Sequence, residues 1–230
     1  MQRNAVIFDF NGAMLFDTSL QLKAWNQVLE ESGRPPVDET TFRDKWNGRS
    51  GREMVAALWG GGLSEQRIHY YRSEKQRIYR ELCQKYPEQF CLAPGLERYL
   101  DTLKKLGVPF AIATSASRYS ANFYYQSLRL DRWFDRDHII SREAVKHGKP
   151  APDLFLVAAE QLHTAPKDCL VFEDSNAGVH AANYAGIGTV IVIDPDCTFY
   201  PDLSLKFDGV YPDFRAVFVE NTVKVPVRNQ

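Results

Sequence analysis

Short runs that are apolar on both faces recur along this 230-residue chain, and amphipathic stretches separate them. A run without apolar–polar alternation is typical of a buried parallel strand rather than a half-exposed antiparallel one. We predict five such strands: Ala5–Phe8, Phe110–Ala113, His138–Ile140, Leu170–Phe172 and Thr189–Ile193. Gly209–Tyr211 is a candidate last strand at the sheet edge. This alternation predicts an α/β fold with a doubly wound parallel sheet, whose ligands bind at the carboxyl ends of the strands.

Residues 18–91 interrupt this rhythm, because they contain helical stretches and no convincing strand. The predicted helices are Ser19–Glu31, Thr40–Trp46, Arg52–Leu58 and Ser64–Lys85. The glycine run at 60–62 is predicted to be a turn between the last two, not a phosphate loop, since no strand precedes it. We therefore predict a core domain of residues 1–17 and 92–230, with an all-helical insert at 18–91.

Composition narrows the choice of partners. The 28 basic and 29 acidic side chains nearly cancel, and a nucleic-acid binder needs a clear basic excess, so we expect no nucleic-acid partner. No apolar run approaches the roughly 20 residues that cross a bilayer. The four cysteines, which include Cys169 and Cys197, show no metal-binding or disulfide spacing, so reduced thiols in a cytoplasmic protein are expected. We expect a monomer.

Acidic residues follow the first and fourth of the five predicted strands. Asp9 comes directly after Ala5–Phe8, and Glu173-Asp174 follows Leu170–Phe172. A carboxylate at the mouth of a parallel sheet can act as a nucleophile or a metal ligand. Three such carboxylates suit Mg²⁺, which prefers one or two carboxylates together with a phosphate oxygen. Taken alone, each of them is more simply a helix cap or a solvated loop residue.

Anion-binding groups follow other strands. Thr114-Ser115 comes after Phe110–Ala113 and before a new helix, where hydroxyls and free backbone N–H groups can bind an anion, although N-capping requires the same residue types. Lys149 stands between a glycine and a proline, so it is less free than a surface lysine and can face a phosphate or a carboxylate. Each of these groups alone is weak evidence, but all of them together, each after a predicted strand, are specific evidence for a site that binds a metal and an anion.

With these motifs the chain resembles the haloacid dehalogenase superfamily, over roughly Ala5 to Ile193. The similarity is to the branch that contains β-phosphoglucomutase and phosphoglycolate-type phosphatases, which carry a helical cap after the first motif. The resemblance implies that Asp9 is the nucleophile that becomes aspartyl-phosphate. It also implies that Thr114 or Ser115 binds phosphate and that Lys149 balances the charge of the nucleophile and the phosphate.

The resemblance further implies the metal ligands and the cap. Asp9, Glu173, Asp174 and the backbone carbonyl of Asn11 match a Mg²⁺ site. Residues 18–91 match the cap, and its loop Asn47-Gly48-Arg49-Ser50 matches one that reaches into the site, with Arg49 contacting substrate. The expected activity is a Mg²⁺-dependent phosphatase acting on a small phosphorylated metabolite. Asp17, where the core passes into the cap, is predicted to be a hinge or cap-start residue.

Asn11 departs from the family pattern. The phosphatases and mutases carry a second aspartate there, which protonates the leaving oxygen and later activates water. An amide cannot exchange that proton, and general acid–base catalysis typically contributes ~10²–10⁴-fold. Ordinary phosphate esters should therefore react slowly, unless another group supplies the proton or the leaving group needs none, as in an acyl phosphate.

Other functions stay open at this point. The chain could be a phosphate-ligand binder or a regulatory protein with little turnover. A β-phosphoglucomutase-like mutase normally needs the second aspartate, so Asn11 weighs against it. A dehalogenase has little use for magnesium, and the acidic pair argues against one. A phosphonatase needs a cap lysine that forms an imine, for which Lys45 is a candidate by location only.

Overall fold

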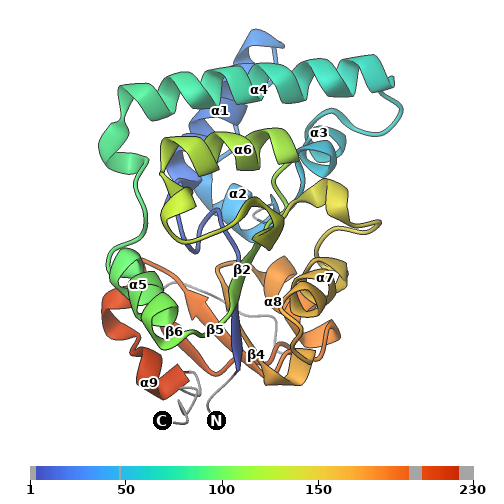
Figure 1. Ribbon diagram of the computed structural model, residues 1–230. Coiled ribbons are helices and arrows are strands. Elements are labelled where there is room, and N and C mark those ends of the chain that lie inside the picture. Colours follow the sequence, from blue (N-terminus) through green and yellow to red (C-terminus); the bar gives the residue numbers. More distant parts are fainter. Residues whose placement is uncertain (1–3, 47, 197–203, 223–230) are drawn as a thin grey trace, which may run out of the picture.

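The computed structural model describes residues 4–46, 48–196 and 204–222 (Figure 1). Its strands form one parallel six-stranded sheet in the order β3-β2-β1-β4-β5-β6. The strands are β1 (Ala5–Phe8), β2 (Phe110–Ala113), β3 (Ile139–Ile140), β4 (Cys169–Glu173), β5 (Thr189–Ile193) and β6 (Gly209–Tyr211). The strand order changes direction between β1 and β4, and this switch point is where open α/β sheets bind ligands.

Helices cover both faces of the sheet. They are α5 (Leu96–Leu106), α6 (Arg118–Ser127), α7 (Asp153–Gln161), α8 (Asn176–Tyr184) and α9 (Val219–Thr222). Successive residues of a strand point to opposite faces. Phe8 accordingly packs in one hydrophobic cluster with Leu100 of α5, whereas Ile7 packs in a second with Phe155 of α7 and Val179 of α8. β1 is thus fully buried, which fixes the position of the residue that follows it.

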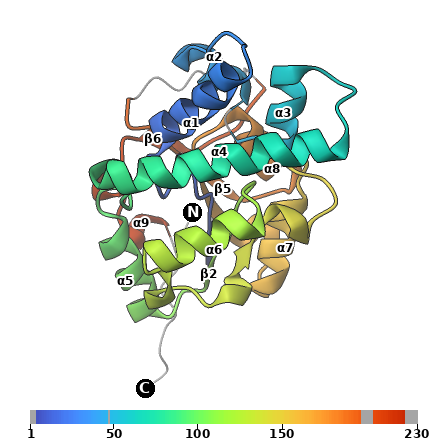
Figure 2. The ribbon, with the colours of Figure 1, turned by 90° about the horizontal axis from the view of Figure 1, so that it is seen from above.

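Four more helices lie above the carboxyl edge of the sheet. They are α1 (Thr18–Glu31), α2 (Glu39–Trp46), α3 (Gly51–Trp59) and α4 (Glu65–Lys85). The long helix α4 packs along α1 and crosses over the core, as the two views show (Figures 1 and 2). At the start of α3, the Ser50 side chain accepts from the Glu53 backbone and Glu53 accepts from the Ser50 backbone, which fixes where that helix begins.

The chain leaves the core for these helices and returns at one place. Leu15 forms an antiparallel bridge with Leu92, and the backbone N–H of Ala93 donates to Met14 O at 2.8 Å. The outgoing and returning segments therefore run side by side beneath the helices. The limits of the cap, between residues 17 and 18 and between residues 91 and 92, stay a prediction.

The single-turn 3₁₀ helices are Pro87–Gln89, Leu130–Arg132, Arg136–His138, Arg142–Ala144, Pro166–Asp168 and Phe214–Ala216.

The predicted α/β class with a parallel sheet and an added helical layer is confirmed. The third strand is shorter than predicted, because His138 ends a 3₁₀ turn instead of pairing with β2. Cys197 and Asn47 lie outside the described residues. None of the described helices has both the length and the apolar character that crossing a membrane requires.

Candidate active site

Asp9 and Glu173 lie on adjacent strand ends at the switch point. The backbone N–H of Asp9 donates to Phe172 O at 2.8 Å, which continues the β1–β4 ladder one residue beyond β1. Oxygens of Asp9, Glu173 and Asp174 lie within 4.8 Å of one another. Three carboxylates at this separation repel one another, so the arrangement requires positive charge close by.

Lys149 supplies part of that charge. Its Nζ donates to Asp9 Oδ1 and to Glu173 Oε1, each at 2.5 Å, and the residue is 1% exposed. Burial by itself lowers the pKa of Lys149, but the two carboxylates outweigh it and raise that pKa above its ordinary value. Burial raises the pKa of Asp9 to about 7, with Lys149 opposing the rise. The site is thus built around one buried cation shared by two acids.

Glu173 has both oxygens engaged by protein donors. While Oε1 accepts from Lys149, Oε2 accepts from the backbone N–H groups of Asp174 and Ser175 at 2.8 and 2.9 Å and from Ser175 Oγ at 3.0 Å. Glu173 therefore orients Lys149 and shapes the turn that presents Asp174. This role adds to the one that the sequence predicts for Glu173.

Two glycines leave the space that the acids occupy. A Cβ on Gly12, which has a φ of +96°, would stand 1.8 Å from Asp174 Oδ2. A Cβ on Gly178, in the first turn of α8, would stand 1.7 Å from Glu173 Oε1. Any side chain at either position would displace a carboxylate. Neither role is apparent from the sequence: Gly12 and Asp174 lie far apart along the chain, whereas Gly178 lies in the helix that follows Glu173 directly.

The donor set fits the predicted magnesium ion. Carboxylate and carbonyl oxygens are hard ligands of the kind that Mg²⁺ prefers, and nitrogen and sulfur ligands are absent from the described cluster. Asp9 and Asp174 would hold the ion, together with the backbone carbonyl of Asn11. Glu173 completes the acidic group.

The predicted anion-binding segment lies beside Asp9. Thr114 is buried after β2, and its Oγ1 accepts from the backbone N–H of Ala116 at 3.0 Å. Ser115 Oγ is buried and has no hydrogen-bond partner in the structure. Ser117 then caps α6, where it accepts from the Ser120 backbone. Of the two hydroxyls that the sequence left open, that of Ser115 is available to a ligand.

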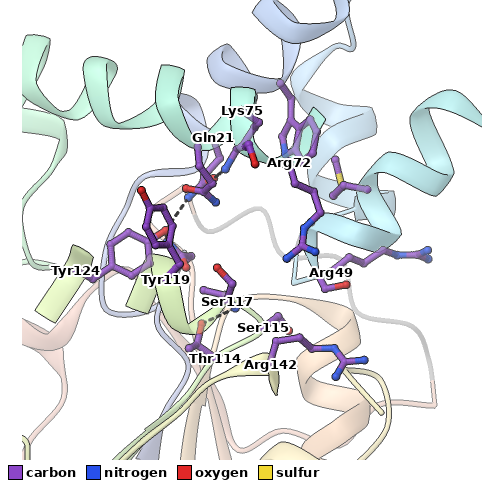
Figure 3. A pocket seen from close by; sticks show the side chains of 18 of the residues that line it. Gln21, Arg49, Arg72, Lys75, Thr114, Ser115, Ser117, Tyr119, Tyr124 and Arg142 are labelled. Atoms are coloured by element: carbon purple, nitrogen blue, oxygen red, sulfur yellow. Dashed lines mark hydrogen bonds between the residues drawn. The ribbon is translucent and has the colours of Figure 1, made fainter. Parts of the chain in front are cut away.

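A cavity of about 730 Å³ joins these groups to the cap (Figure 3). From the core it is lined by Asp9, Asn11, Thr114, Ser115, Ser117, Tyr119, Tyr124 and Arg142, among others. From the cap it is lined by Gln21, Trp25, Arg49, Arg72, Lys75 and Arg80, among others. A ligand in it would touch both layers, which agrees with a cap that closes over the strand ends.

Arg49, predicted to contact substrate, does line the cavity, and Arg72 joins it from α4 (Figure 3). The side chains of both have no hydrogen-bond or ion-pair partner among the described residues. The cap loop also touches the acidic turn, since a Cβ on Gly48 would stand 2.4 Å from Ser175 Oγ. Lys45, the candidate imine-forming lysine, is exposed and lies outside the cavity lining.

Asn11 belongs to a buried polar network at the base of the cap. Its Nδ2 donates to Asp17 Oδ2 at 2.9 Å and to Tyr124 Oη at 3.2 Å. Asp17 Oδ2 also accepts from Gln21 Nε2 at 2.6 Å and from Tyr79 Oη at 2.5 Å. Burial raises the pKa of Asp17, and these hydrogen bonds oppose the rise. Asp17 does mark the start of α1, but its side chain makes no cap hydrogen bond and faces Asn11 instead.

Lys75 extends this network into the cap and was missed by the sequence analysis. Its Nζ donates to Gln21 Oε1 and lies over the rings of Tyr79 and Trp25, at 4.7 and 5.6 Å from their centroids. Burial lowers the pKa of Lys75 to about 8. A signal was present in the sequence, because Lys75 falls at helical spacing between Tyr71 and Ile78, on the apolar face of α4.

Comparison with known proteins places the chain in a family. Residues 6–192 match the family model described as haloacid dehalogenase-like hydrolase. The chain therefore belongs to the haloacid dehalogenase-like hydrolases. A phosphorylated carbohydrates phosphatase of Thermotoga maritima is 30% identical over 187 residues, which cover 80% of this chain and 82% of that protein.

Two further relatives agree. A β-phosphoglucomutase of Bacillus subtilis is 30% identical over 194 residues, covering 81% of each chain. The crystal structure of a family IA, variant 3 hydrolase of this superfamily from Entamoeba histolytica is 32% identical, covers 96% of each chain and has a TM-score of 0.83. The predicted superfamily, its β-phosphoglucomutase-like branch and the enzyme class, a hydrolase with named phosphatases among its relatives, are confirmed.

Proposed function

We propose that this chain is a Mg²⁺-dependent phosphatase that transfers a phosphoryl group from a small phosphorylated metabolite to Asp9. The observation that carries the proposal is the position of Asp9, which lies at the switch point, contacts Lys149 and lines a cavity shared with the cap. Relatives that are named phosphatases support the same reaction class.

In the first step, a carboxylate oxygen of Asp9 attacks phosphorus. The bond from phosphorus to the leaving oxygen breaks, and the leaving group keeps the electron pair. Lys149 neutralises the attacking carboxylate, while Ser115 and the backbone N–H groups before α6 offer donors to the phosphoryl oxygens. Mg²⁺, when bound, would offset the charge that the carboxylates and the phosphoryl group bring together.

In the second step, water attacks phosphorus of the aspartyl-phosphate and regenerates Asp9, with release of inorganic phosphate. Cap closure would exclude bulk water during the first step. Asn11 lines the cavity but has no ionisable group, so neither step gains a proton transfer from it. Substrates whose leaving group departs without a proton, such as acyl phosphates, should therefore react faster than alkyl phosphates.

The cap side of the cavity supports an anionic substrate. Arg49 and Arg72 line it there, and the Arg72 guanidinium is directed into it (Figure 3). A guanidinium fork binds a carboxylate or a second phosphate in bidentate fashion. We propose that the metabolite carries such a group away from the transferred phosphate.

A screen of phosphorylated metabolites with and without Mg²⁺ tests the proposal, with Asp9→Ala measured beside the parent chain. We expect hydrolysis that needs both Mg²⁺ and Asp9, with acetyl phosphate turned over faster than glycerol 3-phosphate. Labelled substrate should mark Asp9. Hydrolysis that survives Asp9→Ala would contradict the mechanism.

A low-turnover phosphate binder is the second candidate, and the specific observation that favours it is the amide at Asn11. Saturable binding of phosphate or a phosphorylated metabolite, without Asp9-dependent release of phosphate from any member of the screen, would establish it instead.

A further inference from the structure

The orientation of the Asn11 amide is determined by its neighbours. Lys75 can only donate a hydrogen bond, so Gln21 must turn Oε1 toward it and Nε2 toward Asp17. Asp17 Oδ2 therefore accepts from Gln21, and it also accepts from Tyr79. Asp17 Oδ2 is therefore a hydrogen-bond acceptor, and Asn11 must donate to it through Nδ2.

This contact determines what Asn11 offers to the cavity. Both N–H groups of a planar amide lie on the nitrogen, and here they are directed to Asp17 and Tyr124. No hydrogen bond joins the carbonyl oxygen of the amide to the described residues, so this oxygen is the part of the amide that remains for a ligand of the cavity that Asn11 lines. At this position the chain can accept a hydrogen bond from a water molecule but cannot donate one to a leaving oxygen.

We propose that Asp17 is a positioning residue that holds the Asn11 amide with its oxygen toward the reacting phosphoryl group. The inference rests on the proposed function. It has a consequence for the chemistry: Asn11 orients the water that attacks the aspartyl-phosphate, and the carboxyl group of Asp17 is held one side chain away from the reacting atoms. Asp17 is 1% exposed and is not among the residues that line the cavity, so it acts through Asn11.

The same geometry makes the pair exchangeable. In the double variant Asn11→Asp/Asp17→Asn, the residue 17 amide donates to the residue 11 carboxylate. Gln21 and Tyr79 donate to the same Asp17 Oδ2 as Asn11 in the parent chain, so they must shift to the amide oxygen of residue 17. The Tyr124 hydroxyl, which accepts a hydrogen bond from Asn11 in the parent chain, donates one to the residue 11 carboxylate in the double variant. The contact between residues 11 and 17 is kept without a second carboxylate, and a carboxyl group now faces the cavity. It can give its proton to the leaving oxygen as the bond to phosphorus breaks, and take one from water in the second step.

The single variant Asn11→Asp lacks this compensation. Two carboxylate oxygens would replace the present N–H···O bond, whose length is 2.9 Å, in a buried setting where like charges repel strongly. Residue 11 would turn away from Asp17 or lose its alignment. We therefore expect the double variant to gain activity on alkyl phosphates, and the single variant to gain much less.

The test measures kcat/KM with acetyl phosphate, p-nitrophenyl phosphate and glycerol 3-phosphate. For the double variant we expect a gain of about 10²-fold or more on glycerol 3-phosphate, with a flatter dependence on the leaving group. Asp17→Ala should lose about 10- to 100-fold on acetyl phosphate, because water is no longer aligned. Asp17→Asn, which keeps the acceptor, should restore most of that loss. Asp101→Asn is a matched control, since Asp101 accepts from Trp133 Nε1 away from the cavity.

Three results would overturn the inference. The first is an equal gain from Asn11→Asp alone, since residue 11 would then not depend on Asp17. The second is no gain from the double variant while the parent chain hydrolyses acetyl phosphate through Asp9. The third is an Asp17→Ala variant as active as the parent. If Asp17→Ala does not fold, the double variant still decides. Absence of Asp9-dependent hydrolysis in every chain, the parent included, would instead refute the proposed function, and the inference with it.

Discussion

Lys149 Nζ lies 2.5 Å from Asp9 Oδ1 in a site where both residues are almost completely buried. The same ammonium group contacts Glu173, so removing it leaves two buried carboxylates without their cation. Removing one partner of a buried ion pair typically costs about 3–5 kcal/mol.

We expect Lys149→Met to lower the free energy of unfolding by about that amount in metal-free buffer, and to abolish hydrolysis. Mg²⁺ should recover part of the lost stability, because it brings positive charge to the same carboxylates. Urea unfolding with and without Mg²⁺ measures both effects. Equal unfolding midpoints for the variant and the parent chain in metal-free buffer would contradict this account of the site.

Mg²⁺ should stabilise the folded chain through Asp9 and Asp174. A ligand that binds only the folded state adds about 2.7 kcal/mol at a hundredfold excess over its Kd. We expect Mg²⁺ to raise the Tm of the parent chain, and Asp174→Asn to remove most of that rise. Asp131→Asn is the control, since Asp131 pairs with Arg129 on the surface. A Tm that responds equally to Mg²⁺ in both variants would place the ion elsewhere.

The pH dependence of stability should report the burial of Lys75. Its pKa falls from 10.5 to about 8 on folding, so Lys75 binds more protons in the unfolded chain between these values, and its contribution to stability must rise with pH there. The slope is at most about 1.4 kcal/mol per pH unit. Lys75→Met should remove this rise, whereas Lys105→Met, on the exposed side of α5, should keep it. Chemical denaturation between about pH 8 and 10 tests the prediction, and a common profile for all three chains would refute it.

Gly12 should tolerate no side chain, for a reason beyond its backbone angle. Both Gly12 and Gly33 have a positive φ, but a Cβ on Gly33 would have no neighbour within 4 Å. Gly33→Ala should therefore cost only the left-handed backbone term of about 1–2 kcal/mol. Gly12→Ala should in addition displace Asp174 and weaken Mg²⁺ binding. Titrating both variants with Mg²⁺ and measuring their unfolding separates the backbone cost from the cost of displacing Asp174. Equal Mg²⁺ affinity of the two variants would show that a Cβ on Gly12 does not displace Asp174.

A contact at the cavity mouth should hold the cap against the core. Arg80 of α4 donates to Tyr119 Oη at 2.7 Å and stacks on that ring, 4.1 Å from its centroid. An exposed cation–π contact contributes about 0.5–1 kcal/mol, so Tyr119→Ala should raise KM about two- to fivefold and Tyr119→Phe less. Steady-state kinetics measure this. An unchanged KM in Tyr119→Ala would show that the contact does not hold the cap.

Much of the fold could be predicted because its strands are buried on both faces. Ala5–Phe8 and Thr189–Ile193 are continuous apolar runs, and the structure reproduces their limits. The length of the two-residue strand β3 was overestimated, since the local turn that ends at His138 determines where pairing with β2 begins. Local apolar pattern therefore determines which strands exist, and turns set the ends of the shortest ones.

The candidate site was partly predictable for the same reason. Asp9, Ser115 and Glu173 follow predicted strands, so the parallel sheet alone brings them together. The network around Asn11 was not predictable, because Asp17 and Tyr79 are separated by 62 residues and meet only when α4 packs over the core. Asp17 looks like a boundary residue in sequence, and only its partners reveal its relation to Asn11.

The bridge between Leu15 and Leu92 has a consequence for how such chains diversify. An insert whose two ends meet at one point can be lengthened, shortened or replaced without moving β1, and so without moving Asp9. Selection can then alter which molecules are admitted while leaving the chemical step in place. In this chain, the covalent connection between the cap and the core is one pair of neighbouring peptide segments, while the cavity between them is lined from both layers.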